Sequence, residues 1–357
     1  MLNHALIGCG RIAQKKHTEA IIKNKDKIKT IAVCDIVKEN AEKVRNILNE
    51  NGIKDIKIYT DYKEMIQNEN LNAVSIATES GKHHEISMYA MKNDINVLVE
   101  KPMALSIKDM DEMIELSEKK NLKLEICFQN RFNPPIQELR KKLTNDDFGK
   151  LFHSQASIRW NRNKNYYDQA NWRGTWEMDG GTLMNQCTHN IDLLIWNSLS
   201  EVEEVYGKTV NYNHDYIDAE DFGTAIIKFK NGMIGIIEGT ANVYPKNLEE
   251  TLSIFGEKGT VVIGGLAVNK IETWNFENEN EHPFQKLPDP DTVYGFGHIP
   301  LYQDFYESII QDKKPLIDGK EGKKAVEVVL AIYKSCKENK PIRFPFEFST
   351  LEMKNCL

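Results

Sequence analysis

Residues 4–13 of the chain read HALIGCGRIA, an apolar strand that turns sharply on two glycines. Gly8 makes the tight turn, since glycine tolerates backbone angles that other residues avoid. Gly10 has no Cβ, so a pyrophosphate can lie against the backbone, and Ala13 lets the following helix pack close to the strand. This G-x-G-x-x-A pattern predicts a dinucleotide-binding turn that opens a βαβ unit.

The residues after the turn indicate which dinucleotide binds. Arg11 and Ile12 lead into the helix, whose free N–H groups and partial positive charge favour phosphate groups. A second apolar run, residues 30–34, ends in Asp35, which can accept hydrogen bonds from two ribose hydroxyls. Because an acid at this place repels a 2′-phosphate, we expect NAD rather than NADP as cofactor. For the glycine pattern taken alone, an ordinary strand–helix turn is the alternative.

The composition is that of a globular protein with two domains. The chain has 357 residues and a net charge of −7. This negative charge disfavours non-specific binding to nucleic acid. No apolar run approaches the roughly 20 residues of a membrane helix, so we expect neither a membrane nor a nucleic acid as partner. The chain leads directly into a strand, which indicates no signal peptide. Six scattered cysteines without a C-x-x-C pair indicate reduced thiols in a cytoplasmic protein without a metal site.

Strands and helices alternate over the first 125 residues. Short apolar runs are separated by amphipathic stretches, which predicts a parallel, doubly wound sheet in an α/β domain, residues 1–125. Ligands of such sheets lie at the carboxyl ends of the strands. The residues to inspect therefore follow the strands: Gly8, Asp35, Thr78, 100–102 and 129–131.

Residues 126–357 read differently and form the second expected domain. Its strand candidates alternate apolar with polar residues, and Asn231-Gly232 between two of them is a strong hairpin signal. The pattern predicts a largely antiparallel sheet with one polar and one apolar face. Two helices, 301–311 and 319–337, are expected to close the chain.

The first candidate for chemistry is Glu100-Lys101-Pro102, at the end of a predicted strand where a nicotinamide ring would reach. A lysine can move a proton when partial burial and a nearby positive charge lower its pKa. Pro102 fixes the chain direction after the lysine and is compatible with a cis bond. The alternative is an exposed lysine in a loop, which is what most lysines are.

The second candidate is the stretch 180–192, where two glycines open a helix. Asn185, His189 and Asp192 stand at i, i+4 and i+7, so they share one helix face. Such a face can hold a sugar and a general base, and histidine suits proton abstraction near neutral pH. Asp192 either orients the imidazole or braces the helix. The alternative for His189 is a satisfied core histidine.

Taken together and in this order, the motifs resemble those of the Gfo/Idh/MocA oxidoreductases. They are the turn at 8–13, Ala77-Thr78 with His83 after it, Glu100-Lys101-Pro102 and the block 180–192. The resemblance covers nearly the whole chain. It implies a Rossmann domain, then a C-terminal α/β domain with a large open, mainly antiparallel sheet. It also implies NAD(P)-linked oxidation or reduction of a sugar or cyclitol hydroxyl, and a homo-oligomer, dimer or tetramer, formed through the open sheet.

The resemblance also implies three sets of site residues. The resemblance implies that Lys101 and His189 act as a catalytic pair at the reacting carbon. The cofactor set is Gly8, Gly10, Arg11, Ile12, Asp35, Thr78, His83, Glu100 and Lys101. The substrate set is Lys101, Asn130, Arg131, Arg159, Tyr166, Asn185 and His189.

One departure from the family pattern concerns the substrate. The family usually has an aspartate four residues before the histidine, whereas this chain has Asn185. The change removes an anionic partner and shifts the base role toward His189 or Lys101. Together with residues 130–134, 159–162 and 166–181, it makes the chain similar to UDP-N-acetylglucosaminuronate 3-dehydrogenases. This similarity implies NAD-dependent oxidation of the C3 hydroxyl of a nucleotide-linked sugar, in the biosynthesis of polysaccharide sugars.

The side chains of these segments suit a charged, nucleotide-bearing substrate. Arginine pairs with carboxylate and phosphate, and aromatic rings offer flat surfaces to a sugar or a uracil. The candidates are Arg131, Arg159, Arg162, Arg173, Trp160, Tyr166, Tyr167 and Trp172, of which we expect about half to be structural.

Two other functions fit the same residues less well. One is another sugar or inositol dehydrogenase, or a sugar ketoreductase that runs the reaction in the opposite direction. The other is a non-catalytic NAD-sensing regulator, which predicts loss of the lysine or the histidine, and both Lys101 and His189 are present.

Overall fold

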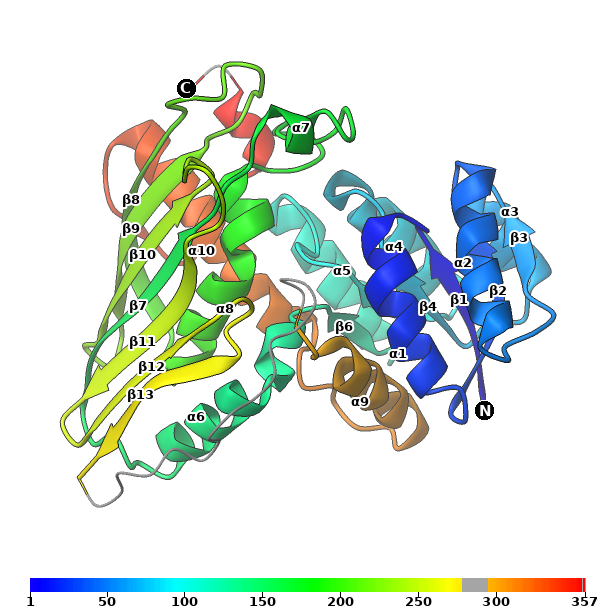
Figure 1. Ribbon diagram of the computed structural model, residues 1–357, viewed down its shortest axis with the longest axis horizontal. Coiled ribbons are helices and arrows are strands. Elements are labelled where there is room, and N and C mark those ends of the chain that lie inside the picture. Colours follow the sequence, from blue (N-terminus) through cyan, green and yellow to red (C-terminus); the bar gives the residue numbers. More distant parts are fainter. Residues whose placement is uncertain (278–294, 355, 357) are drawn as a thin grey trace. The chain divides into compact units, whose positions relative to one another are not determined.

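A computed structural model describes residues 1–277, 295–354 and 356 (Figure 1). It consists of two compact units. Unit 1 comprises Met1–Ala104, Lys108–Phe128 and Gly297–Lys323, and unit 2 comprises Leu105–Ile107, Gln129–Phe296 and Lys324–Leu357.

The division differs from the expected domains 1–125 and 126–357 by a few residues at 105–107 and 126–128 and by one long segment. Residues 297–323 belong to unit 1, although they lie far along the chain. Their helix, α9 (His298–Ile310), packs against α1 (Thr18–Lys23), and the Tyr302 hydroxyl lies 2.6 Å from Nδ1 of His17. The late segment thus completes the core of the first unit.

Unit 1 contains a six-stranded parallel sheet covered by helices, as the sequence predicts. The central strand β4 is buried at every position, which explains its continuous apolar run. In sheet order the strands are β3 (Lys57–Tyr59), β2 (Ile28–Cys34), β1 (Leu2–Ile7), β4 (Ala73–Ile76), β5 (Asn96–Val99) and β6 (Leu124–Ile126). The other helices are α2 (Lys38–Glu50), α3 (Tyr62–Asn68), η2 (Ser80–Lys82), α4 (His83–Lys92) and α5 (Ile107–Lys119).

The strand order reverses between β1 and β4. Strands β2 and β3 lie on one side of β1, and β4, β5 and β6 lie on the other. In a doubly wound sheet the ligand crevice lies at this switch point, outside the carboxyl ends of the strands. Gly8 follows β1 and Ala77 follows β4, so the predicted turn stands at the switch point.

Unit 2 contains an eight-stranded sheet in which β7 and β10 pair in parallel and the other neighbours are antiparallel. In sheet order its strands are β13 (Lys270–Phe276), β12 (Gly259–Gly264), β11 (Glu249–Gly256), β7 (Leu151–Arg159), β10 (Ile234–Thr240), β9 (Phe222–Phe229), β8 (Val202–Val210) and β14 (Ile342–Arg343). Its helices include η3 (Gln129–Phe132), α6 (Pro134–Thr144), α7 (Lys164–Tyr167), α8 (Thr188–Asn197), η5 (Thr350–Met353) and, from Lys324 on, α10 (Gly319–Glu338).

The expected two faces of this sheet are present. Side chains of alternate residues on β9 are buried, while Ile226 is 56% exposed. The buried side faces the helices: a Cβ at Gly235 would meet Leu194 of α8, and one at Gly207 would meet Ile332 of α10. Asn231-Gly232 forms the predicted hairpin between β9 and β10, with a positive φ of 87° at Gly232.

Two short π-helical turns precede the helices that begin after the glycine motifs. They are η1 (Ala13–His17), before α1, and η4 (Leu183–Cys187), before α8. Such turns are rare and occur often at functional sites. Among the described helices, none is both long enough and apolar enough to span a bilayer.

Candidate active site

The glycine turn after β1 has the geometry that a dinucleotide requires. Gly8 has a φ of +89°, and a Cβ there would lie 2.5 Å from the carbonyl of Ala77, so only glycine fits. At Gly10 a Cβ would meet no atom within 4 Å. The backbone at Gly10 therefore borders open space of the kind a pyrophosphate needs.

Asp35 is held at the end of β2 by two backbone amides. Its Oδ2 accepts the N–H of Cys9 at 2.7 Å, and its Oδ1 accepts the N–H of Val37 at 2.8 Å. Each carboxylate oxygen keeps a further lone pair. The half-buried carboxylate can therefore accept hydrogen bonds from the ribose of a bound dinucleotide while it braces the turn.

Four other residues of the expected cofactor set follow the glycine turn or strand β4. Arg11 is exposed, and Ile12 and Thr78 are half-buried. His83 is only 1% exposed, and its ring nitrogens lie 2.7 Å from the Pro102 carbonyl oxygen and 3.1 Å from that of Thr78. Burial lowers the pKa of His83. The buried ring therefore lies between carbonyl groups of the loops after β4 and β5, and its expected direct contact with the cofactor stays a prediction.

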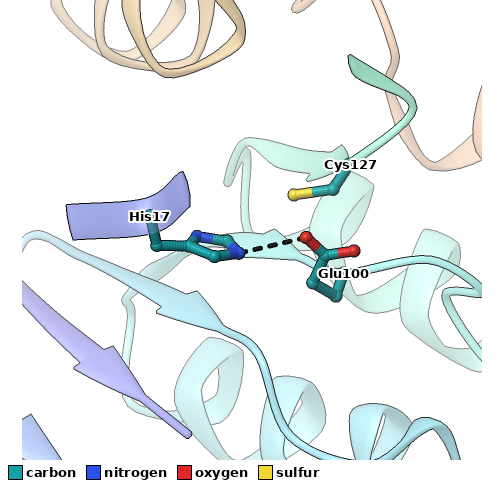
Figure 2. Close-up of side chains that lie close together, drawn as sticks. All are labelled: His17, Glu100 and Cys127. Atoms are coloured by element: carbon teal, nitrogen blue, oxygen red, sulfur yellow. Dashed lines mark hydrogen bonds and ion pairs between the residues drawn. The ribbon is translucent and has the colours of Figure 1, made fainter. Parts of the chain in front are cut away.

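Glu100 is a buried anion directly before Lys101 (Figure 2). Its Oε1 accepts from Nε2 of His17 at 3.0 Å, and its Oε2 accepts the N–H of Lys101 at 3.2 Å. Burial by itself would raise the pKa of Glu100, but hydrogen bonds and positive charge from His17 and His298 hold it well below its usual value. The Lys101–Pro102 bond is cis, and the Lys101 side chain is half-buried.

The same cluster contains a set of donors that could hold a metal ion. Donor atoms of His17, Glu100 and Cys127 lie within 4.8 Å of one another (Figure 2). The His17 and Glu100 atoms already bond to each other. Burial and the charge of Glu100 raise the pKa of the Cys127 thiol well above its usual value, which disfavours the thiolate that a metal binds. These contacts favour a hydrogen-bonded cluster.

In unit 2, the glycine pair Gly180 and Gly181 leaves space for the carboxyl group of Glu220 beside the start of η4. Gly180 and Gly181 have φ values of +82° and +95°, and a Cβ at Gly181 would overlap the Glu220 carboxyl. Oε1 of Glu220 accepts the N–H of Leu183 at 2.8 Å. Burial raises the pKa of Glu220 to about 8. Glu220 thus caps the segment that carries Asn185 and His189.

Asn185 and His189 are half-buried and have neighbours that the sequence reasoning missed. The Asn185 amide donates to Oδ1 of Asp179, whose Oδ2 accepts the N–H of Gly174 at 2.7 Å. The carboxylate absent from position 185 is therefore supplied by the neighbouring Asp179. Nε2 of Gln129 lies 3.5 Å from Nε2 of His189. The available signals were the position of Asp179 beside the glycines and that of Gln129 after a strand.

Two arginines and one tyrosine form a cluster near this helix. The Tyr166 ring lies 5.0 Å from the guanidinium carbon of Arg162 and 4.4 Å from that of Arg173. Gln186 joins the group: its Oε1 accepts from Nε of Arg162 at 2.8 Å, and its Nε2 donates to the Tyr166 hydroxyl at 2.7 Å. Glu250 is 3% exposed, and burial raises its pKa to about 8 while Arg162 opposes the shift.

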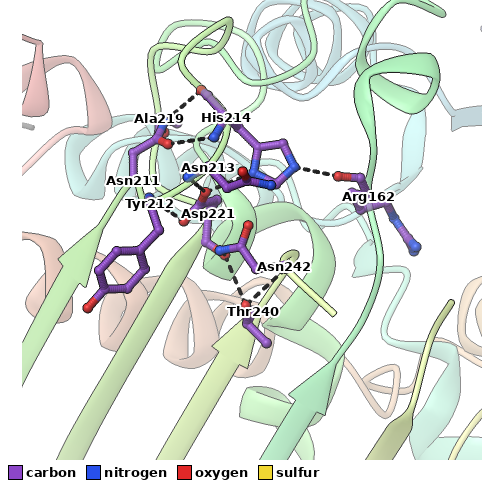
Figure 3. A network of polar contacts seen from close by, with 9 residues as sticks. All are labelled: Arg162, Asn211, Tyr212, Asn213, His214, Ala219, Asp221, Thr240 and Asn242. Atoms are coloured by element: carbon purple, nitrogen blue, oxygen red, sulfur yellow. Dashed lines mark hydrogen bonds and ion pairs between the residues drawn. The ribbon is translucent and has the colours of Figure 1, made fainter. Parts of the chain in front are cut away.

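A buried network holds the backbone of Arg162 (Figure 3). The Asp221 carboxylate accepts the N–H groups of Tyr212 and Asn213, at 3.0 and 2.8 Å, and lies 2.8 Å from Nδ1 of His214. Nε2 of His214 lies 2.6 Å from the carbonyl oxygen of Arg162. Arg162 is therefore fixed at its backbone as well as at its guanidinium group.

Arg131 has a structural partner in place of the expected substrate contact. It is fully buried, and its Nε and Nη2 donate to the two Asp192 carboxylate oxygens at 2.8 and 2.6 Å. Of the two roles left open for Asp192, this pairing matches bracing of the helix. Asn130 is also buried, at 2% exposed, and it begins the short helix η3 with Gln129.

Arg159 lies on the other face of the sheet from η4 and α8. Its guanidinium donates to Glu238 of β10, at 2.8 and 2.5 Å, and to Glu249 of β11. The neighbouring Gly239 faces Cys187 of η4, so Glu238 faces away from that helix. Strand alternation therefore separates Arg159 from Asn185 and His189, and the predicted substrate role of Arg159 has no support in this geometry.

Comparison with known proteins supports the interpretation of both units. Residues 2–128 match the family model for the NAD-binding Rossmann fold of the Gfo/Idh/MocA oxidoreductases. Residues 140–344 match the model for the C-terminal alpha/beta domain of the same family. The chain belongs to the Gfo/Idh/MocA oxidoreductase family. The resemblance drawn from its motifs is thereby confirmed, as are the NAD-binding domain and the two-domain fold.

Two solved members of the Gfo/Idh/MocA family are similar over their whole length. The WlbA dehydrogenase of Bordetella pertussis, solved with NADH and UDP-GlcNAcA, is 32% identical, with a TM-score of 0.86 and coverage of 97% of this chain and 99% of that one. The WlbA dehydrogenase of Chromobacterium violaceum, solved with the same ligands, is 34% identical, with a TM-score of 0.86 and coverage of 97% of each chain.

A relative that acts on a polyol is more distant in sequence. The myo-inositol 2-dehydrogenase of Thermotoga maritima is 25% identical over 351 residues, which cover 95% of this chain and 97% of that protein. The chain is accordingly an NAD-dependent oxidoreductase of the sugar and inositol type within the Gfo/Idh/MocA family.

Proposed function

We propose that this Gfo/Idh/MocA chain oxidises the C3 hydroxyl of UDP-linked N-acetylglucosaminuronate with NAD. The observation that carries the proposal is the cluster in which Arg162 and Arg173 flank the Tyr166 ring. Guanidinium groups beside an aromatic ring suit a substrate that bears carboxylate, phosphate and a flat base. The two WlbA dehydrogenases, solved with NADH and UDP-GlcNAcA, support the same substrate class.

The residues of unit 1 fit the cofactor. The turn from Gly8 to Ala13 offers the pyrophosphate an open backbone, and Asp35 offers acceptors to the adenosine ribose. NAD supplies the acceptor for a hydride from the oxidised carbon when it is bound. The chain itself has to bind and orient the sugar and take the proton of its hydroxyl.

Lys101 and His189 are the groups that we assign to this proton. The amide N–H of Gln129 can only donate, so its approach to His189 fits a neutral imidazole with a lone pair on Nε2, the form of a general base. Asn185, fixed by Asp179, offers an amide to the sugar. Lys101, held through its backbone by Glu100, offers the second proton-carrying group.

A substrate panel tests the proposal. Purified protein is assayed for NADH formation with UDP-N-acetylglucosaminuronate, UDP-N-acetylglucosamine, free glucose and myo-inositol. We expect turnover of the uronate, and slower or no turnover of the others, because only the uronate carries both the nucleotide and the carboxylate. Turnover of inositol or glucose without turnover of the uronate would show that the chain acts on a free polyol, like its Thermotoga relative.

The substitution Lys101→Met tests the assigned role of the lysine. It keeps an unbranched side chain without the ammonium group, and we expect kcat to fall by about 10²–10⁴-fold, the usual contribution of a general acid or base. NADH affinity, measured by fluorescence titration, should stay near that of the wild type. Lys119→Met, at the exposed end of α5, serves as control. Unchanged hydride transfer in Lys101→Met would refute the role.

A further inference from the structure

We propose that a buried chain of hydrogen bonds, running from Thr30 to Glu100 through the core of unit 1, positions Lys101 for catalysis. Its members are Thr30, His4, Ser75, Tyr302, His17 and Glu100. They are positioning residues, since they act through Lys101. The proposal rests on the role that the proposed function gives to Lys101.

The contact at the Glu100 end has a fixed direction. A carboxylate only accepts, so Nε2 of His17 donates to Oε1 of Glu100 across 3.0 Å. The Tyr302 hydroxyl lies 2.6 Å from the other ring nitrogen, Nδ1. Burial raises the pKa of Tyr302 well above its usual value, so the phenol keeps its proton.

The chain of contacts continues beyond Tyr302. Tyr302 also hydrogen-bonds Ser75, whose Oγ lies 3.0 Å from Nε2 of His4. Nδ1 of His4 lies 3.1 Å from Oγ1 of Thr30. Burial, with the charge of His17, lowers the pKa of His4 to about 3, so this ring is neutral and has one N–H and one lone pair. The contacts therefore form a continuous line of hydrogen-bonding groups from Thr30 to Glu100.

The members come from six places in unit 1 and share one property. They lie on β2, β1, β4, α9, η1 and the loop after β5, and none is more than 8% exposed. A line of hydrogen bonds in a low-dielectric core strengthens each of its bonds and stabilises the anion at its end. Tyr302 comes from α9, so the late segment 297–323 contributes one member of this line to unit 1.

The free end of the Glu100 carboxylate reaches Lys101. Oε2 accepts the N–H of Lys101 at 3.2 Å, and the next carbonyl, that of Pro102, is held by His83 at 2.7 Å. A buried carboxylate costs several kcal/mol in desolvation, and apolar packing would stabilise a core at least as well. The burial of the Glu100 carboxylate is therefore best explained by its role in holding the backbone at Lys101.

Matched substitutions on α9 test the chain. Tyr302→Phe removes one hydroxyl that belongs to the chain. Tyr306→Phe removes a hydroxyl one turn later that is equally buried and has no hydrogen-bond partner among the described residues. We expect Tyr302→Phe to lower kcat by about 10-fold or more, as small displacements of a catalytic group do. KM for the sugar and Kd for NADH should stay within about twofold. Tyr306→Phe should leave all three unchanged.

A double-mutant cycle then asks whether the effect passes through Lys101. His17→Gln is combined with Lys101→Met. We expect His17→Gln to lower kcat by about 10- to 100-fold in the wild type, and by less than about twofold in the Lys101→Met protein. The assay uses whichever sugar or polyol the wild type turns over, so a wrong substrate assignment does not affect it. Thermal unfolding of each variant confirms that folded proteins are compared.

Several outcomes would overturn the proposal. Equal losses in Tyr302→Phe and Tyr306→Phe would show general packing, and so would a His17→Gln loss that persists fully without Lys101. Loss of NADH affinity in place of kcat would show a cofactor-binding role. Stoichiometric zinc in the wild type, measured by elemental analysis and lost in His17→Gln, would show that His17, Glu100 and Cys127 bind a metal. Full activity of Lys101→Met would refute the catalytic role of Lys101 and with it this proposal, whereas turnover of a free polyol in place of the uronate would refute only the proposed substrate.

Discussion

At the scale of single residues, the partner of each arginine decides its role. Arg131 is buried in a bidentate pair with Asp192, and Arg159 is paired with Glu238. Breaking such a buried pair costs about 3–5 kcal/mol, so Arg131 serves stability. Arg162 and Arg173 instead lie against Tyr166 and are half-buried, with surface left for a ligand.

Replacement of Arg173 by Gln tests the ligand-binding role of the arginine cluster. A hydrogen bond to a charged group contributes about 1.5–3 kcal/mol, so we expect KM for the UDP-linked uronate to rise roughly 10- to 100-fold, with a smaller change in kcat. Steady-state kinetics measures both constants. Arg159→Gln removes an arginine on the opposite sheet face and should leave KM unchanged. An equal rise in both variants would contradict the assignment.

Local motifs allowed the sequence to predict residues whose role depends on backbone geometry. Gly8 needs a positive φ, and Lys101 precedes a cis proline, as the motifs indicated. The sequence placed Gln129 and Asp179 within stretches of interest but did not predict their side-chain contacts with His189 and Asn185. Such contacts depend on tertiary packing, which spacing along the chain does not encode.

At the scale of elements, the two glycines of the β1 turn have different tasks. Gly8 is required by the fold, since a Cβ there would overlap Ala77. Gly10 has open space around it, so the fold tolerates a methyl group there. The pattern G-x-G thus combines one structural glycine with one that makes room for a ligand.

The substitution Gly10→Ala tests this distinction. We expect NAD affinity to fall by at least about 10-fold, because the methyl group occupies the space of the pyrophosphate, while stability changes by less than about 1 kcal/mol. Isothermal titration with NAD and chemical unfolding measure the two effects. Gly8→Ala should instead destabilise the folded protein. If Gly10→Ala bound NAD as the wild type does, the cofactor would not lie against this backbone.

Because Glu220 is buried beside η4, we expect the stability of the folded protein to depend on pH. The pKa of Glu220 rises from 4.5 to about 8 on burial. At pH values between 4.5 and about 8, the Glu220 carboxyl is deprotonated in the unfolded chain and protonated in the folded chain. Folding therefore becomes less favourable as the pH rises.

Glu220→Gln removes this effect, because the amide stays neutral and its oxygen can still accept from Leu183. At pH 5 we expect little difference from the wild type. At pH 8 the variant should be more stable by a few kcal/mol, since each pKa unit corresponds to about 1.36 kcal/mol. Urea unfolding at the two pH values measures the difference. A difference that did not change with pH would show that Glu220 does not retain its proton on folding.

At the scale of the whole molecule, periodicity predicted both sheets but not their complete membership. The alternation of strands and helices predicted the parallel sheet of unit 1. The alternation of apolar with polar residues predicted the open sheet of unit 2. The sequence did not show that α9 completes unit 1, because the contact between Tyr302 and His17 joins residues 285 positions apart. It also did not reveal α6 and β13.

The open face of the unit 2 sheet carries a row of apolar side chains across three strands. Ile226 of β9 pairs with Tyr206 of β8 and with Ile236 of β10. Ile226 is 56% exposed and Tyr206 is 39% exposed. All three face away from α8 and α10, because Gly207, Gly223 and Gly235 on the same strands face those helices or η4. An exposed apolar row of this kind on a sheet marks an interaction surface.

We predict that this row forms the interface of a homo-oligomer and that Ile226→Glu dissociates it. A carboxylate at the centre of the row would be buried without a partner on assembly, which costs several kcal/mol for each subunit. Light scattering after size-exclusion chromatography should show a dimer or tetramer for the wild type and a smaller species for the variant. Ile310→Glu, at a 61% exposed position at the end of α9 in unit 1, is the control and should keep the assembly of the wild type. If Ile226→Glu kept that assembly too, the subunits would associate through a different surface, and a monomeric wild type would refute the prediction outright.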